Sequence, residues 1–257
     1  MRRGELLQAL EGGGLLDRLE PVYGADAAGA ARRLADLTRG YAGVFPGGEE
    51  EDVRLFSVPG RTELGGNHTD HQWGRCLAGS VDLDTIACAA PNGTNMVRIQ
   101  SRNHRMAEVS LDDLSVHPAE TGSSVSLVRG VAARLREMGH AVGGFNAYTT
   151  TRVLRSSGLS SSAAFEVMVG TIMNHLFCGG VLTPLQLAQV GQYAENVYYG
   201  KPCGLMDQLA CASGGVIAID FADPAAPSLR QVQVDLEREG YALVIVDAGA
   251  GHADLTE

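Results

Sequence analysis

The order of helical and strand-like patterns constrains the fold of this 257-residue chain more than any other feature. Apolar side chains keep helical spacing through residues 4–46, and strand-like alternation begins at Val53. From there, strands and helices mix without the regular strand–helix–strand alternation of a doubly wound sheet. The pattern therefore predicts an α+β fold in which helices pack on a mixed sheet.

Individual elements can be assigned from period, caps and breakers. We expect strands at 53–58, 81–90, 96–100, 145–151, 216–221 and 241–246, and helices at 125–138, 160–177, 183–199 and 205–213. The Asn92-Gly93 turn predicts that strands 81–90 and 96–100 pair as a hairpin. The acidic run 47–52 is typical of a solvated linker. It separates a helical extension, residues 1–50, from a main domain at 51–257.

Composition excludes several classes of protein. A formal net charge of -10 argues against non-specific binding to nucleic acid or to anionic membranes. We expect the five cysteines to be reduced thiols, mostly buried, because none has C-x-x-C spacing. The start of the chain lacks the apolar stretch of a secretory signal, and no apolar run reaches about 18 residues. A cytoplasmic location follows as the default expectation.

The segment 155–164 joins a predicted strand to a predicted helix and consists mainly of serine, glycine and alanine. Small residues let the backbone approach a ligand, and a helix N-terminus offers free N–H groups with a positive dipole end. This combination favours a phosphate site. The alternative is a serine-rich helix cap without a ligand. The segment is not a Walker loop, because no Gly-Lys-Ser/Thr follows.

The segment 59–71 combines glycines with many hydrogen-bonding side chains. Sugars are recognised through directed hydrogen bonds, and Asn, His and Asp provide both donors and acceptors. Two alternatives remain open for this segment. One is a metal site formed by His68, Asp70 and His71, whose close spacing lacks the usual zinc pattern. The other is a solvated turn.

A third segment, 200–208, places Asp207 among apolar and small residues. We expect this carboxylate to be buried, and a buried carboxylate needs a cation or donors to stay ionised. Arg61 is the natural candidate partner. The alternative is an aspartate that caps the start of a helix.

Together and in this order, the three segments resemble a known family. Gly60-Arg61-x-x-Leu64-x-Gly66-x-His68-Thr69-Asp70 resembles the galactokinase signature. Gly158-Leu159-Ser160-Ser161-Ser162-Ala163 resembles the phosphate loop of the GHMP superfamily, which includes homoserine, mevalonate and phosphomevalonate kinases. Cys203-Gly204-Leu205-Met206-Asp207-Gln208 resembles the segment with the galactokinase catalytic aspartate. The resemblance implies an N-terminal kinase domain like domain 2 of ribosomal protein S5.

The resemblance also implies an activity, the phosphorylation of a monosaccharide by ATP with Mg²⁺, and galactose at its anomeric hydroxyl is the expected substrate. Asp207 would orient or accept the hydroxyl proton, and Arg61 would hold Asp207 ionised and stabilise the phosphoryl group. The implied sugar-binding residues are Asn67, His68, Asp70 and Gly204. The implied phosphate-binding residues are Gly158, Leu159, Ser160, Ser161, Ser162 and Ala163, and Ser162 with Glu195 would hold Mg²⁺.

The chain departs from the family pattern at several positions. Asn67 stands where galactokinases usually carry Glu, which opens the choice of sugar. Glu63, His71 and Gln72, and Leu154 and Ser156 before the phosphate loop, also differ from the usual residues. A related kinase acting on another sugar, or a regulator that binds sugar and ATP without catalysis, are the alternative functions.

The family's glycine-rich third motif and its C-terminal domain do not occur in this sequence. We therefore expect the chain alone to have little or no activity. We also expect it to self-associate through the apolar face that the missing domain would cover.

Overall fold

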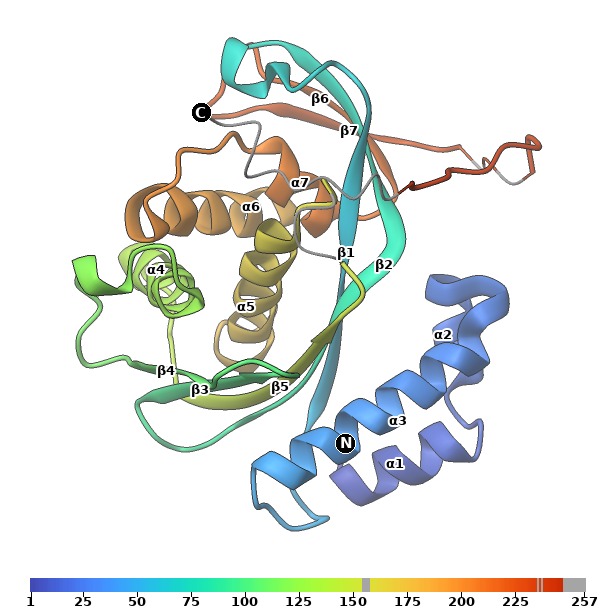
Figure 1. Cartoon of the computed structure of the whole chain (residues 1–257), viewed down its shortest axis with the longest axis vertical. Coiled ribbons are helices and arrows are strands. Elements are labelled where there is room, and N and C mark those ends of the chain that lie inside the picture. The colour runs from blue at the N-terminus through green and yellow to red at the C-terminus, as the bar shows by residue number, and fades with distance from the viewer. Residues whose placement is uncertain (154–157, 235, 237, 247–257) are drawn as a thin grey trace.

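The computed structural model describes residues 1–153, 158–234, 236 and 238–246, and a mixed sheet forms the centre of this described part (Figure 1). Its seven strands follow the order β4-β3-β5-β2-β6-β7, and β1 pairs with β2. Only β3 and β5 run parallel; the other pairs are antiparallel. The strands are β1 (Arg54–Gly65), β2 (Arg75–Pro91), β3 (Met96–Ser101), β4 (Ala107–Ser110), β5 (Phe145–Thr151), β6 (Val216–Asp220) and β7 (Ser228–Val232).

One face of the sheet is covered by four α-helices and a π-helical turn. They are α4 (Ser124–Glu137), α5 (Ser161–Phe177), α6 (Pro184–Tyr193), the turn η4 (Ala194–Tyr199) and α7 (Met206–Ser213). The largest core cluster lies between these helices and the sheet, and α5 contributes Val167, Met168 and Ile172 to it. A second cluster packs α7 on β2 and β6 through Met206, Leu209 and Ile217.

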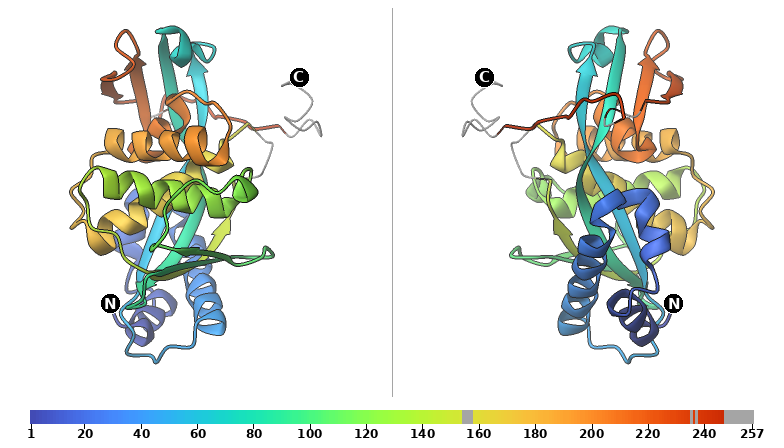
Figure 2. Two further views of the ribbon diagram at one scale, coloured as in Figure 1. Left: turned by 90° about the vertical axis from the view of Figure 1, so that its left-hand side faces the viewer. Right: turned by 90° about the vertical axis from the view of Figure 1, so that its right-hand side faces the viewer.

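The opposite face is covered at one end by the N-terminal helices (Figure 2). These are α1 (Arg3–Glu11), α2 (Leu16–Tyr23) and α3 (Ala27–Val44). Leu34, Leu37 and Tyr41 of α3 form a buried stripe that packs on Ile86 and Cys88 of β2. The helical structure predicted for residues 4–46 is therefore confirmed, but glycines after α1 and α2 divide it into separate helices.

Strand β2 changes partner along its length, and this change creates the place where the candidate site lies. Residues 85–91 of β2 pair with β5, and residues 75–79 pair with β6. The stretch 80–84 between them faces β1 but has neither β5 nor β6 beside it. Arg61 of β1 is in register with Ser80 in this stretch. Val153, just after β5, and Leu159, just before α5, pack on Val81 of this stretch.

The α+β prediction and most elements are confirmed, including the strand 145–151 and the capping box at Thr183–Gln186. The predicted hairpin of 81–90 with 96–100 is wrong, because β5 lies between β2 and β3. Asn92 explains the difference. Its side-chain amide donates to the Met96 carbonyl and to Asn146 Oδ1, and its N–H donates to the Gly144 carbonyl. The turn is thus tied to the start of β5.

Other predictions need correction. Residues 241–246 are irregular and exposed rather than a strand, whereas β4 and β7 form at sites that alternation did not reveal. The acidic run is not wholly solvated, since Glu51 accepts hydrogen bonds from Tyr41 and Arg3. All five cysteines are free thiols, and Cys76, Cys88 and Cys211 are buried, as expected. None of the described helices is long and apolar enough to cross a membrane.

Candidate functional site

An ion pair between Arg61 of β1 and Asp207 of α7 forms the centre of the candidate site. Arg61 Nε lies 2.8 Å from Asp207 Oδ1, and its Nη2 lies 2.7 Å from Oδ2, so the pair is bidentate. Arg61 Nη1 also donates to the carbonyl of Gly158, 2.5 Å away. The arginine side chain is only 7% exposed, whereas the Asp207 side chain is 32% exposed. The contact anticipated from sequence therefore exists, but Asp207 is half-buried rather than buried.

The N-terminus of α5 meets the same carboxylate. Ser160 precedes the helix in a left-handed conformation, with φ of 59°, and its hydroxyl donates to Asp207 Oδ2 at 2.5 Å. Because that hydroxyl is used on Asp207, no side chain caps the first turn of α5. The first N–H groups of a helix lack intrahelical partners. They are therefore available to an anion beside Asp207.

The loop before α5 is fixed to β1 by backbone contacts. The Arg61 N–H donates to the Leu159 carbonyl at 3.2 Å, and Gly158 has a φ of 73°. Leu159 itself is buried in a small cluster with Val81 and Val153. Ser161 and Ala163 lie in the first turn of α5. Leu154 and Ser156, which differ from the residues usual in the family, lie outside the described residues.

Ser162 and Glu195 come together at the first turn of α5. The Ser162 hydroxyl donates to Glu195 Oε1 at 3.3 Å, and the Glu195 side chain belongs to the buried π-helical turn η4. One hydroxyl and one carboxylate at an uncapped helix N-terminus are oxygen ligands of the kind that Mg²⁺ prefers. Among the described residues, no group of three or more His, Cys, Asp or Glu could hold a metal.

Asp70 lies against the start of α7, below the Asp207 segment. Its Oδ2 accepts the Met206 N–H at 3.2 Å, and His71 Nδ1 lies 3.3 Å from its Oδ1. Gly204 allows this approach, because a Cβ at that position would lie 1.7 Å from Asp70 Oδ2. Asp70 and Gly204 are thus packed against each other, and together they hold the loop after β1 on α7.

Asn67 and His68 lie on the exposed part of that loop, and both have positive φ angles. The backbone N–H of His68 donates to both carboxylate oxygens of Glu63, at 2.9 and 3.0 Å. The structure therefore brings Arg61, Asp207, Ser160 and the α5 N-terminus into contact. Asn67 and His68 remain at the surface of the neighbouring loop.

Two buried residues beneath the site were missed by sequence reasoning. Glu166 follows Ser162 by one turn of α5 and is 1% exposed, and Gln208 follows Asp207 and is fully buried. Burial raises the pKa of Glu166 well above its ordinary value, and the Glu195 charge adds to this effect. A glutamate inside the apolar stripe of residues 165–176 was the available signal.

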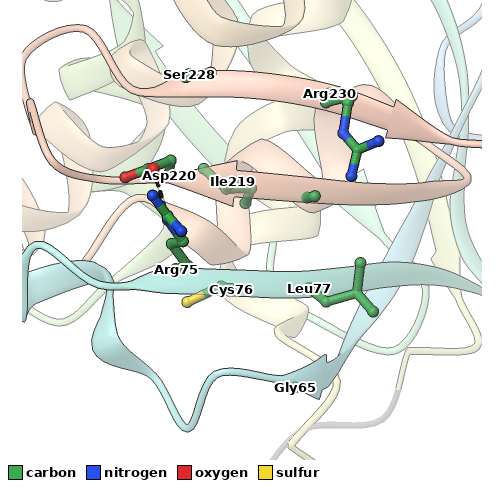
Figure 3. A pocket seen from close by; sticks show the side chains of 9 residues that line it. Gly65, Arg75, Cys76, Leu77, Ile219, Asp220, Ser228 and Arg230 are labelled. Atoms are coloured by element: carbon green, nitrogen blue, oxygen red, sulfur yellow. Dashed lines mark hydrogen bonds and ion pairs between the residues drawn. The ribbon is translucent and has the colours of Figure 1, made fainter.

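A shallow groove of about 520 Å³ lies elsewhere, on the sheet face turned away from α7 (Figure 3). Leu77 and Ala218 form its floor. An ion pair between Arg75 and Asp220, 2.7 Å apart, lies at its rim together with Arg230. None of the residues of the Asp207 site lines it, so the groove and the candidate site are separate features.

Two family models match the chain, on segments that meet at the site. Residues 41–91 match the "Galactokinase galactose-binding signature", and residues 126–215 match the "GHMP kinases N terminal domain". The first contains Arg61 and Asp70, and the second contains Ser162, Glu195 and Asp207.

Curated relatives and solved structures agree with these models. The galactokinase of Streptomyces coelicolor is 35% identical over 210 residues, which cover 80% of this chain and 53% of the relative. That of Lactococcus lactis subsp. cremoris is 33% identical over 228 residues, covering 87% and 55%. The chain thus spans about half the length of these relatives.

A solved Lactococcus lactis galactokinase complexed with galactose superposes with a TM-score of 0.70 at 29% identity, over 79% of this chain and 53% of that one. A Methanococcus jannaschii mevalonate kinase superposes at 0.59 and 16% identity, over 73% and 58%, which shows a common fold. The expected fold of a GHMP kinase N-terminal domain is confirmed.

Proposed function

We propose that this chain, a member of the galactokinase family within the GHMP kinases, serves in the ATP-dependent phosphorylation of galactose at its anomeric hydroxyl. The observation that carries the proposal is the convergence of three groups. The Arg61 guanidinium, the Asp207 carboxylate and the uncapped N-terminus of α5 meet within hydrogen-bonding distance. A kinase requires a group that orients the substrate hydroxyl next to the site that holds the ATP phosphates.

Asp207 is proposed to receive the sugar hydroxyl. Its partial exposure leaves room for a ligand, while Arg61 and Ser160 hold its orientation. In the reaction, the sugar oxygen forms a bond to the γ-phosphorus and the bond from that phosphorus to the β–γ bridging oxygen breaks. Because a carboxylate is a weak base for a sugar hydroxyl, the proton can move to Asp207 late in the transfer, once the sugar oxygen has begun to bond to phosphorus. Arg61 would stabilise the charge that develops on the phosphoryl oxygens.

The α5 N-terminus is proposed to hold the ATP phosphates through backbone groups of Gly158, Leu159, Ser160, Ser161, Ser162 and Ala163. Ser162 and Glu195 would hold Mg²⁺, and their donor set fits this ion. When bound, Mg²⁺ neutralises charge on the phosphate oxygens. The protein's own contribution here is a fixed helix end beside Asp207, which aligns donor and acceptor.

Asn67, His68, Asp70 and Gly204 are proposed to form the sugar side of the site. Asp70 anchors the loop on α7, and the exposed Asn67 and His68 would bind sugar hydroxyls. An amide at position 67 can both donate and accept, unlike a carboxylate, so the preferred hydroxyl pattern should differ from that of a site with Glu.

We also propose the wider organisation. Residues 1–50 form a helical extension and residues 51–257 form the kinase N-terminal domain, in a cytoplasmic protein without nucleic acid or membrane partners. The exposed apolar side chains at 243–246 support self-association of the chain in isolation.

The test is a coupled assay that follows ADP formation from Mg·ATP with galactose and a panel of other monosaccharides. Because the chain spans about half of its relatives' length, the assay is run on the chain alone and on a fusion to the C-terminal half of the S. coelicolor galactokinase. We expect galactose-dependent ADP and galactose 1-phosphate from the fusion and little turnover from the chain alone. Calorimetric binding of galactose and ATP without product would instead indicate a non-catalytic regulator.

A further inference from the structure

Gln208 occupies a position between two buried carboxyl groups. Its Nε2 lies 2.9 Å from Glu195 Oε2 and 3.2 Å from Glu166 Oε2. The side chain is fully buried and is adjacent in sequence to Asp207. One amide therefore donates to both carboxyl groups, and it does so directly beneath the proposed phosphate site.

The two oxygens of Glu195 have different partners, and this difference fixes the plane of its carboxylate. Oε2 accepts from Gln208, whereas Oε1 accepts from the Ser162 hydroxyl. Glu195 lies on a π-helical turn, a local irregularity that often aims side chains at functional sites. Besides the amide, the Ser162 hydroxyl at 3.3 Å and the Cys203 thiol, a weak donor, contact this carboxylate.

No arginine or lysine forms an ion pair with these two carboxyl groups in the part of the chain that the structure describes. None of its ion pairs involves Glu195 or Glu166. The space is also filled: a Cβ on Gly191 of α6 would lie 3.2 Å from Gln208 Cγ and 3.3 Å from Glu166 Cβ. The amide is thus held in place by packing from α5, α6 and α7, so it can act as a rigid donor.

We propose that Gln208 is a positioning residue that aims Glu195 at the metal and phosphate site, an inference that rests on the proposed function for the identity of that site. Groups that orient metal ligands set the affinity of the site for its ion. Gln208 connects this orientation to Asp207 through one helix, so the metal side and the acceptor side of the site share a rigid support.

Crystal structures of the 257-residue chain and its Gln208 variants give the first test. Gln208→Met keeps the length of the side chain without the donor, and Gln208→Asn keeps the amide but shortens its reach. We expect both to release Glu195 Oε2 and to lose the contact between Glu195 and Ser162. An unchanged Glu195 in either folded variant would overturn the proposal. Ser213→Ala, at the other end of α7, is the matched control.

Titration with Mn²⁺ in the presence of ADP, followed by electron paramagnetic resonance, gives the second test. We expect the Gln208 variants to bind Mn²⁺ about 10- to 100-fold more weakly, while Ser213→Ala binds as the wild type does. A purely structural role for Gln208 would lower the melting temperature and leave this affinity unchanged, which would contradict the proposal. If neither the wild-type chain nor its fusion to the C-terminal half of the S. coelicolor galactokinase binds Mn²⁺ with ADP, the proposed function fails, and the crystal structures still decide the role of Gln208.

Discussion

Two aspartate–arginine pairs lie on opposite sides of the β1–β2 pair, and their patterns of exposure are reversed. On the side of the N-terminal helices, Asp84 of β2 pairs with Arg33 of α3, and their side chains are 5% and 18% exposed. On the side of α7, Asp207 pairs with Arg61, and the values are 32% and 7%. In the first pair the carboxylate is the more enclosed partner, whereas in the second it is the arginine.

The hydrogen bonds of Asp84 explain the first arrangement. It accepts from Arg33, from the Tyr23 hydroxyl at 2.8 Å and from Ser57 at 2.8 Å, so all its donors come from the protein. Such a carboxylate joins helices to a sheet and has no surface left for a ligand. Asp207, in contrast, is held by Arg61 and Ser160 from below and remains open on one side. The comparison teaches that a carboxylate enclosed by its donors has a structural role, whereas one that is left open on one side can receive a ligand.

The largest expected effect breaks the enclosed pair. Asp84→Ala leaves three donors without their acceptor, so we expect the free energy of unfolding to fall by about 3 kcal/mol. Urea denaturation of the chain measures this change. Asp82→Ala, an exposed position on the same strand, should change it by less than about 0.5 kcal/mol. Equal effects of the two substitutions would show that the Asp84 network contributes little.

The second effect concerns the open pair and appears in turnover rather than stability. Asp207→Asn keeps an acceptor for Arg61 but removes the charge that meets the sugar hydroxyl. We expect turnover in the fusion protein to fall on the order of 10²-fold or more. The free energy of unfolding should change by less than about 1 kcal/mol, because the carboxylate is partly solvated. An unchanged rate would remove Asp207 from the mechanism.

The sequence predicted the open pair better than the enclosed one, for a physical reason. Arg61 and Asp207 lie in short segments with unusual glycine and polar content, so each stood out locally. Asp84 lies in an alternating strand and looks like an ordinary polar position. Its burial depends on α2 and α3 packing on that face, which no local pattern reveals. The same holds for Gln208, whose role depends on three helices meeting.

The sequence also did not predict the pairing of strands that lie far apart along the chain. The period of β2 and β3 was visible, but the insertion of β5 between them depends on contacts more than 50 residues away. The apolar run 241–246 predicted a strand, yet these residues belong to no sheet in the described part of the chain. The spacing of apolar residues identifies candidate strands, whereas the neighbouring strands in the sheet decide whether they form.

A third carboxyl group, Glu166, tests what happens when a buried acid has no arginine. Burial raises its pKa, so above about pH 4.5 the folded chain holds a proton that the unfolded chain releases. Stability must therefore fall as pH rises from there toward the raised pKa, by up to about 1.4 kcal/mol per pH unit. Glu166→Gln removes this dependence. We expect the melting temperature of this variant to rise relative to that of the wild type as pH increases. If the two melting temperatures change with pH in the same way, the raised pKa of Glu166 is contradicted.

The smallest effect sharpens the comparison at a single hydroxyl. Tyr23→Phe removes one donor from Asp84 but leaves Arg33 and Ser57 in place, so we expect a loss of about 1 kcal/mol in the free energy of unfolding. The pKa of Tyr23 is raised to about 12, chiefly by burial, so the hydroxyl stays protonated and can donate up to high pH. Tyr241→Phe, an exposed position, is the control in the same urea titration. Sugar binding should be equal in both variants, because the enclosed pair contacts α2 and α3 and not the loop after β1. A loss of sugar binding in Tyr23→Phe alone would mean that the two pairs are coupled through β1 and β2.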